Sequence, residues 1–178
     1  MKGHVDLAVL RNLLGNRHEA RLKQLGADPN LARRYQIVCL PENFWAARKS
    51  DELLEASETA DIGKLLKEAG LRCAMPHELG FQTPVAVRRS ADLWGGLIWI
   101  LDNLAAPTFV AVLSSWLTAR YVAGKEGARS KPPTVHLAIG IRRHDQLSTL
   151  QYDGDAHSLV QILKGLSQPE DDGTNPKE

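Results

Sequence analysis

The side chains that could do metal or thiol chemistry in this chain are a histidine and glutamate pair and two cysteines. His77 and Glu78 begin the HExxH pattern of zinc-dependent hydrolases, but the second histidine of that pattern is replaced by Phe81. Cys39 and Cys73 lack CxxC spacing and lie in apolar runs, which is typical of buried thiols in a cytosolic protein. The sequence therefore predicts no metal site.

Motifs for nucleotide binding and nucleophilic catalysis are also missing from the sequence. The chain contains neither the glycine-rich patterns GxxxxGKS/T and GxGxxG nor the serine pattern GxSxG. Without such loops a phosphate group has no backbone cradle, and without a placed nucleophile there is no covalent chemistry to expect. We therefore expect no cofactor and assign no catalytic residue from these motifs.

The apolar stretch Leu93–Leu117 separates two classes of function. Its 25 residues exceed the roughly 20 that a helix needs to cross a bilayer. However, Asp102 lies near its middle and would cost about 2.5 to 3.5 kcal/mol there, and Pro107 interrupts a single helix. We expect an apolar helical hairpin over residues 90–123, with its turn just before Pro107. A hairpin buried in a globular domain is the leading interpretation, and a hairpin that inserts into a membrane is the alternative.

The same stretch supplies the candidate interaction residues. Tryptophan side chains act either as core anchors or as interfacial aromatics, so they fit both interpretations. An aspartate inside a membrane is a functional residue by default. The candidate interaction residues are Trp94, Trp99, Trp116 and Asp102.

Basic residues cluster directly after the apolar stretch. Their position fits attraction to an anionic membrane surface, worth about 1 kcal/mol per charge. Binding of nucleic-acid phosphates is disfavoured because few aromatic residues lie between the charges, and a solvated linker is the third interpretation. The basic patch comprises Arg120, Lys125, Arg129, Lys131, Arg142 and Arg143.

Patterns outside the apolar stretch predict an α+β fold. The segment VDLAVLRNLL at residues 5–14 predicts an amphipathic helical arm. A strand at residues 35–40, a charged helix and a strand at residues 71–75 predict a small βαβ unit. The segment PVAVRR, residues 84–89, predicts a short edge strand.

The C-terminal part predicts a β-hairpin followed by a helix. Val135, Leu137, Ile139 and Ile141 alternate with smaller or polar residues, and QLSTLQY returns as the partner strand. The helix AHSLVQILKGL then packs its apolar side against the hairpin. The predicted units are a helical arm with an α/β unit (1–89), a helical hairpin (90–123), a β-hairpin plus helix (134–167) and a disordered tail (168–178).

Length and charge add two expectations. The 178 residues and the net charge of +1 are ordinary for a globular protein and give no general attraction to nucleic acid. The N-terminal segment has too short an apolar core for a secretion signal, which favours a cytoplasmic location.

The order of the apolar stretch, a basic linker and the segments VHLAIGI, QLSTLQYDG and SLVQILKGL resembles the effector-associated constant component. That module belongs to bacterial conflict and phage-defence systems, and the resemblance covers residues 93–166. It implies a non-enzymatic adaptor or regulatory protein that associates with another protein, an effector or a sensor. It implies no catalytic residue.

Two other functions remain open at this stage. One is a membrane-inserting effector that uses residues 93–117 and anionic lipid, and a homo-oligomer is compatible with both this and the adaptor. The other is an enzyme, because the run LLKEAGLRCAM resembles small α/β domains that cleave NAD in bacterial immunity. Glu78 is then the candidate catalytic residue.

Overall fold

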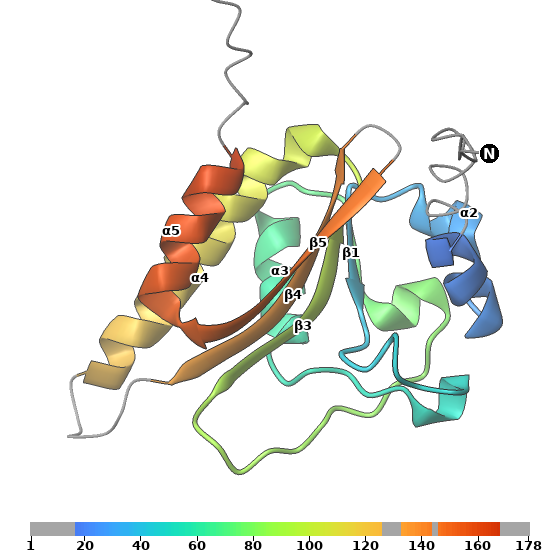
Figure 1. The fold of residues 1–178 in the computed structure, drawn as a ribbon, viewed down its shortest axis with the longest axis horizontal. Helices are drawn as coiled ribbons and strands as arrows, with labels where there is room; N and C mark the ends of the chain where they lie inside the picture. The colour runs from blue at the N-terminus through green and yellow to red at the C-terminus, as the bar shows by residue number, and fades with distance from the viewer. Residues whose placement is uncertain (1–16, 126–132, 144–145, 168–178) are drawn as a thin grey trace, which may run out of the picture.

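The computed structural model describes residues 17–125, 133–143 and 146–167, of which residues 17–24 are helical. The strands form one five-stranded sheet in the order β2-β1-β3-β4-β5 (Figure 1), and the predicted α+β class is confirmed. The further elements are α2 (Pro29–Ala32), β1 (Ile37–Leu40), η1 (Ser50–Glu52), α3 (Thr59–Glu68), β2 (Cys73–Ala74), η2 (Pro76–Leu79), β3 (Leu93–Ile100), η3 (Asn103–Ala105), α4 (Ala106–Lys125), β4 (Thr134–Arg143), β5 (Gln146–Asp155) and α5 (Ala156–Ser167).

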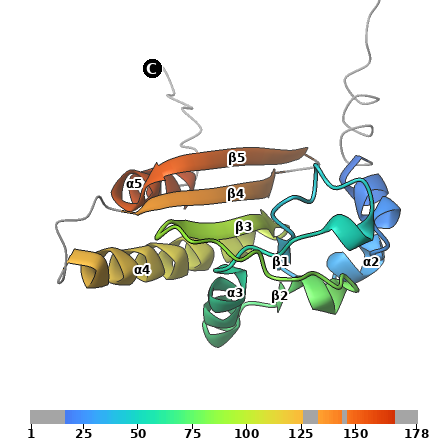
Figure 2. The ribbon, with the colours of Figure 1, turned by 90° about the horizontal axis from the view of Figure 1, so that it is seen from below.

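The sheet is mixed, and its two ends arise from different parts of the chain (Figure 2). At one end β1 and β2 are parallel and are joined through α3, as the predicted βαβ unit requires. At the other end β4 and β5 form the predicted antiparallel hairpin, followed by α5. Between them, β3 runs antiparallel to β1 and parallel to β4. The strands of the predicted units 1–89, 90–123 and 134–167 therefore share one sheet.

Apolar side chains pack on both faces of this sheet. On the helix face, Ile98 and Ile100 of β3 belong to one buried cluster with Phe109 of α4 and Leu159 of α5. The opposite face, which we call the open face, is covered over β1 and β3 by the helical residues 17–24, α2 and adjoining loops. This covering does not extend over β5, where the open-face side chains of Thr149, Gln151 and Asp153 are exposed.

The predicted helical hairpin over residues 90–123 is wrong in its first half. Residues 93–100 form β3, a central strand, and only the second half is helical, in α4, with Pro107 in its first turn. Two consecutive glycines cost about 1 kcal/mol each in a helix, whereas isoleucine and tryptophan favour strands. A strand buried on both faces also reads as a continuous apolar run, which is why the sequence pattern resembles a helix.

The division of this stretch bears on the membrane alternative. Residues 93–117 lie partly in the centre of the sheet and partly in α4. Among the described residues, no helix combines the length and the apolar character needed to cross a bilayer.

Two smaller expectations are wrong, and two others concern residues outside the described part of the chain. The edge strand predicted at residues 84–89 is wrong, because that segment forms only a single bridge, between Val85 and Glu55. The last helix is expected to bury its apolar side chains against the hairpin, including Ile162, but Ile162 is 40% exposed. The helical arm at residues 5–14 and the tail at residues 168–178 lie outside the described residues.

A β-bulge in β3 sets which side chains reach the open face. Between the pairs Trp94 with His136 and Gly96 with Leu137, β3 advances two residues while β4 advances one. Leu97 belongs to the open-face cluster. If side chains alternated regularly between the two faces from Leu97 back to Trp94, the Trp94 side chain would point toward the helices. The extra residue instead places Trp94 beside His136. Gly96 makes this possible with φ of +74°, a conformation that suits glycine.

We predict that Gly96→Ala destabilises the fold by about 1 to 3 kcal/mol, because a side chain at positive φ is strained. Its Cβ would also lie 3.0 Å from Thr59 Oγ1 and 3.2 Å from Ala56 Cβ. The matched control is Gly165→Ala in α5, where nothing lies within 4 Å of the added atom and helix propensity predicts a gain of about 1 kcal/mol. Urea unfolding measures both, and equal effects of the two substitutions would contradict this account of the bulge.

Candidate functional site

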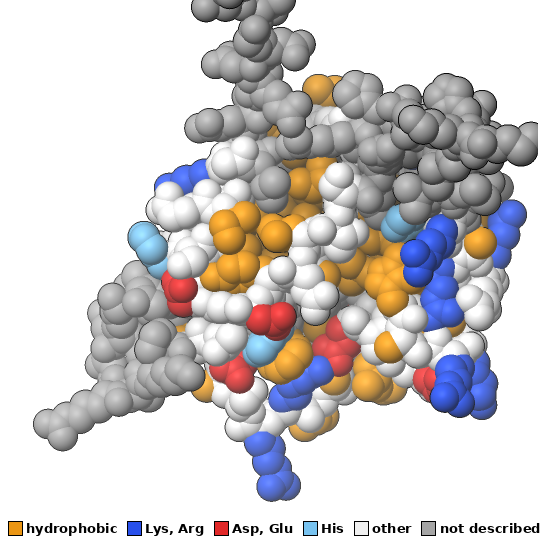
Figure 3. Space-filling model, in the orientation of Figure 1, with side chains coloured by type: hydrophobic (Ala, Val, Ile, Leu, Met, Phe, Trp, Pro, Cys, Tyr) orange, Lys and Arg blue, Asp and Glu red, His pale blue; other side chains and the backbone are white. Residues whose placement is uncertain are grey.

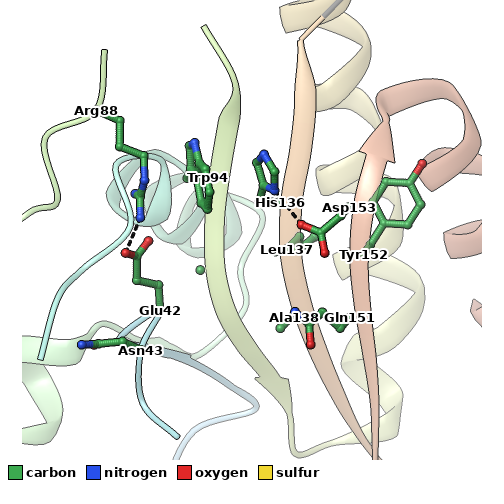
Figure 4. Close-up of a pocket in the computed structure, with 11 residues that line it drawn as sticks. Glu42, Asn43, Arg88, Trp94, His136, Leu137, Ala138, Gln151, Tyr152 and Asp153 are labelled. Atoms are coloured by element: carbon green, nitrogen blue, oxygen red, sulfur yellow. Dashed lines mark hydrogen bonds and ion pairs between the residues drawn. The ribbon is translucent and has the colours of Figure 1, made fainter. Parts of the chain in front are cut away.

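Five side chains form a row across the open face near the start of β3. Trp94 of β3, His136 of β4 and Asp153 of β5 stand opposite one another in the strand registers. Arg88, from the extended segment before β3, and Glu42, from the loop after β1, continue the row on the other side of Trp94 (Figure 4). We call this set the ladder.

Each member of the ladder contacts the next. The Arg88 guanidinium carbon lies 3.8 Å from the Trp94 ring centroid, and the His136 ring stacks on Trp94 with centroids 3.8 Å apart and planes at 15°. At the ends, Glu42 forms an ion pair with Arg88, and His136 Nδ1 lies 2.6 Å from Asp153 Oδ1. Both faces of the indole ring are therefore occupied, one by a cation and one by an imidazole.

The ladder is buried at one end and exposed at the other. The side chains of Glu42 and Arg88 are 16% and 25% exposed, whereas that of Asp153 is 58% exposed. Three buried atoms, Glu42 Oε2, Arg88 Nη1 and Trp94 Nε1, have no hydrogen-bond partner among the described residues. Each of these atoms can accept a hydrogen bond from, or donate one to, a group bound beside them.

The ladder borders a cavity of about 220 Å³. Asn43 and Gln151 add amide groups to its lining, and Leu137 and Ala138 add apolar ones. On the face of the molecule drawn in Figure 3, acidic, basic and histidine side chains lie close to hydrophobic ones. The lining contains no serine, threonine, cysteine or lysine, and the Tyr152 hydroxyl donates a hydrogen bond to the Asp155 carbonyl. The arrangement is suited to binding by hydrogen bonds and stacking.

The predicted interaction residues do not lie on one surface. Trp94 is in the ladder, but Trp99 is 3% exposed in the open-face cluster and Trp116 is 8% exposed in the helix-face cluster. Asp102 has a structural role, since it accepts hydrogen bonds from the Leu104 N–H and the Gln36 side chain and so begins η3.

Two members of the predicted basic patch have described side chains. Arg120 on α4 forms ion pairs with Asp61 and Glu58 at the start of α3, with N to O distances of 2.8 and 3.5 Å. Arg142 is exposed on β4. The side chains of Lys125, Arg129, Lys131 and Arg143 lie outside the described residues. Arg120 thus already neutralises acidic groups of its own chain.

Four ladder residues, Glu42, Arg88, His136 and Asp153, were not identified from the sequence. A signal for two of them exists in the hairpin, because the register that pairs Arg143 with Gln146 also places His136 opposite Asp153. Glu42 and Arg88 come from loops and carry no periodic signal. The bulge that brings Trp94 to the same face is indicated only by the glycine pair that follows it.

Glu78, the candidate catalytic residue of the enzyme alternative, lies outside the cavity lining. Its carboxylate accepts hydrogen bonds from Lys67 Nζ at 2.7 Å and from the Met75 N–H at 2.7 Å, which ties α3 to η2. Burial acts to raise the pKa of Glu78, but the hydrogen bonds and the Lys67 charge outweigh it and hold the pKa below its usual range. The carboxylate is therefore stabilised as an anion in a structural contact.

We predict that Glu78→Gln lowers stability at neutral pH and reduces the loss of stability on acidification. Because the folded pKa of Glu78 is depressed, its contribution is present above the unfolded pKa and is lost as pH falls through the folded pKa. Glu68→Gln is the control, since its pair with Lys64 is 3.9 Å long and exposed. Thermal unfolding between neutral and acid pH measures both, and identical pH profiles for Glu78→Gln and the unsubstituted protein would contradict the prediction.

We predict a coupling free energy of about 1 kcal/mol between Arg88 and Trp94, from the interaction of the cation with the indole face. The measurement is a double-mutant cycle of Arg88→Ala and Trp94→Ala in urea unfolding. Arg88→Ala combined with Arg120→Ala provides the control cycle, because Arg120 lies on α4 and pairs with α3. Additive effects in both cycles would show that the stack contributes nothing.

The ladder thus combines a stacked indole, two carboxylates, a guanidinium and an imidazole around one small cavity. Such a set can bind a polar group of matching shape. Strand register and the bulge fix the positions of Trp94, His136 and Asp153, whereas Glu42 and Arg88 are supplied by loops. Compared with known proteins, the chain matches no protein-family model, no curated protein and no solved structure.

Proposed function

We propose that this chain is a non-enzymatic adaptor or regulatory protein that binds a partner protein through the ladder and the exposed segment beside it. The observation that carries the proposal is the set of buried, unpartnered polar atoms on Glu42, Arg88 and Trp94 beside the cavity. A partner group that pairs with these atoms gains free energy that the isolated fold leaves unused.

The unpartnered atoms define the chemistry of the group that fits. Glu42 Oε2 accepts a hydrogen bond, whereas Arg88 Nη1 and Trp94 Nε1 donate one. A peptide amide, or the side-chain amide of asparagine or glutamine, carries one acceptor and at least one donor. The cavity of about 220 Å³ is below the roughly 300 to 1,000 Å³ of small-molecule sites. It therefore suits a single protruding side chain or turn better than a large cofactor.

Exposed apolar side chains lie on the segment that carries Arg88 and on the residue beside its pairing partner, and we call this set the apolar rim. Val87, directly before Arg88, is 94% exposed, and Val85 is 54% exposed on the same segment. Leu54, 37% exposed, precedes Glu55, whose backbone pairs with that segment. Arginine and tryptophan are enriched at the energetic centres of protein interfaces.

The biological setting of the proposal comes from the resemblance of residues 93–166 to the effector-associated constant component. On that basis the partner is an effector or sensor of a bacterial defence system, and the location is the cytoplasm. The membrane-inserting alternative has less support, because residues 93–100 would have to leave the centre of the sheet and expose both of its apolar faces.

We predict that Val87→Asp weakens partner binding at least tenfold, about 1.4 kcal/mol, because it places a charge in the apolar rim. The matched control is Leu104→Asp, since Leu104 is 87% exposed but lies in η3, beyond the opposite end of β3. Proteins captured in the native host by the unsubstituted chain are identified, purified and titrated against all three forms by calorimetry.

Binding that is weakened by Val87→Asp and unchanged by Leu104→Asp supports the proposal. Binding that tolerates Val87→Asp, or that is lost equally with both substitutions, rejects this surface. Titration with Arg88→Ala then tests the cavity itself, because the proposal requires a further loss in that variant while far-ultraviolet circular dichroism stays unchanged.

A further inference from the structure

The strand β5 forms one edge of the sheet over its full length. All ten of its residues pair with β4, from Gln146 with Arg143 to Asp155 with Thr134. On its other side, no strand of the described residues pairs with it, and Figure 2 shows β5 as the outermost strand. A continuous row of backbone donors and acceptors therefore faces outward.

This edge lacks the features that keep strand edges from pairing. Proteins protect long edges with lysine, proline, bulges or covering elements. The sequence of β5, QLSTLQYDGD, contains no lysine, arginine or proline, and its pairing with β4 has no register shift. Ser148, Thr149 and Gln151 are exposed and uncharged. The middle of the edge can therefore approach another strand without a charge penalty.

Side chains of opposite charge lie at the two ends of the hairpin formed by β4 and β5. Asp153 and Asp155 lie at the C-terminal end of β5, and Asp153 faces the open side. At the other end, Arg142 of β4 is exposed and stands opposite Leu147. When two such edges meet antiparallel about a two-fold axis, the acidic end of each lies at the basic end of the other. The charge pattern is therefore complementary to itself.

We propose that β5 pairs antiparallel with β5 of a second copy of this chain, which joins two sheets into one. When Leu150 of one copy stands opposite Leu150 of the other, Thr149 of one copy stands opposite Gln151 of the other, and Leu147 opposite Asp153 of the other. Arg142 and Asp153 of the second copy are then two strand spacings apart, roughly 10 Å between backbones. An arginine and an aspartate side chain can together span that gap on the open face.

The resulting dimer would present two ladders on the same face of a continuous sheet. Each ladder ends at Asp153 of β5, so the two are related by the axis that passes between the paired edges. This inference concerns self-association and is independent of the partner proposed above. A failure of Val87→Asp to affect partner binding leaves it unchanged.

The test uses pairs of charge substitutions on the full chain. Thr149→Lys with Gln151→Lys places like charges across the axis, and Thr149→Glu with Gln151→Glu does the same with the opposite sign. Each variant alone should lose the dimer, and an equal mixture should restore it as a heterodimer. The control is Ala111→Lys with Ser115→Lys, two exposed positions on α4, which should remain dimeric.

Light scattering during size-exclusion chromatography gives the mass, which should be near twice 19.6 kDa for the unsubstituted protein. A monomeric unsubstituted protein, dimeric charge variants, or a mixture that stays monomeric would each overturn the proposal. Hydrogen exchange of the unsubstituted protein tests it without any variant. The β5 amides should become more protected as protein concentration rises, and exchange independent of concentration overturns the proposal.

Discussion

The bulge at Gly95 and Gly96 is the constraint on which the open face depends. It lets β3 keep Ile98 and Ile100 against the helices while Trp94 turns to the opposite side and stacks on His136. Without the extra residue, Trp94 would compete for space in the helix-face cluster, and Arg88 would lose the ring that holds it. One irregular residue pair thus determines both the packing of β3 and the existence of the ladder.

The position of β3 explains how far the sequence could predict the fold. The alternation at residues 134–143 indicated a strand with one buried face, and the βαβ unit followed from short apolar runs flanking a charged helix. β3 has neighbours on both sides and apolar contacts on both faces, so its pattern has no period of two. The apolar length of this stretch predicts a helix that includes Trp94, Gly95 and Gly96, although the glycine pair has low helix propensity.

The residues of the candidate site also differ in how far the sequence could predict them. The pair of His136 and Asp153 is a consequence of the register of two strands that follow each other in the chain. Arg88 reaches Trp94 from a segment whose path depends on the bridge between Val85 and Glu55, a contact between residues 30 positions apart. Contacts of that range leave no periodic trace in a sequence. The functional residues that were missed are therefore the ones supplied by loops.

Asp153 belongs both to the ladder and to the edge proposed for self-association. One of its oxygens lies beside His136, while more than half of the side chain is exposed at the end of β5. A partner that shifts the stack of Arg88, Trp94 and His136 would move this carboxylate and so change its attraction to Arg142 of a second copy. Linkage then requires the reverse, that self-association changes partner affinity by the same factor. The ladder therefore gives the two proposed associations a physical route by which each can regulate the other.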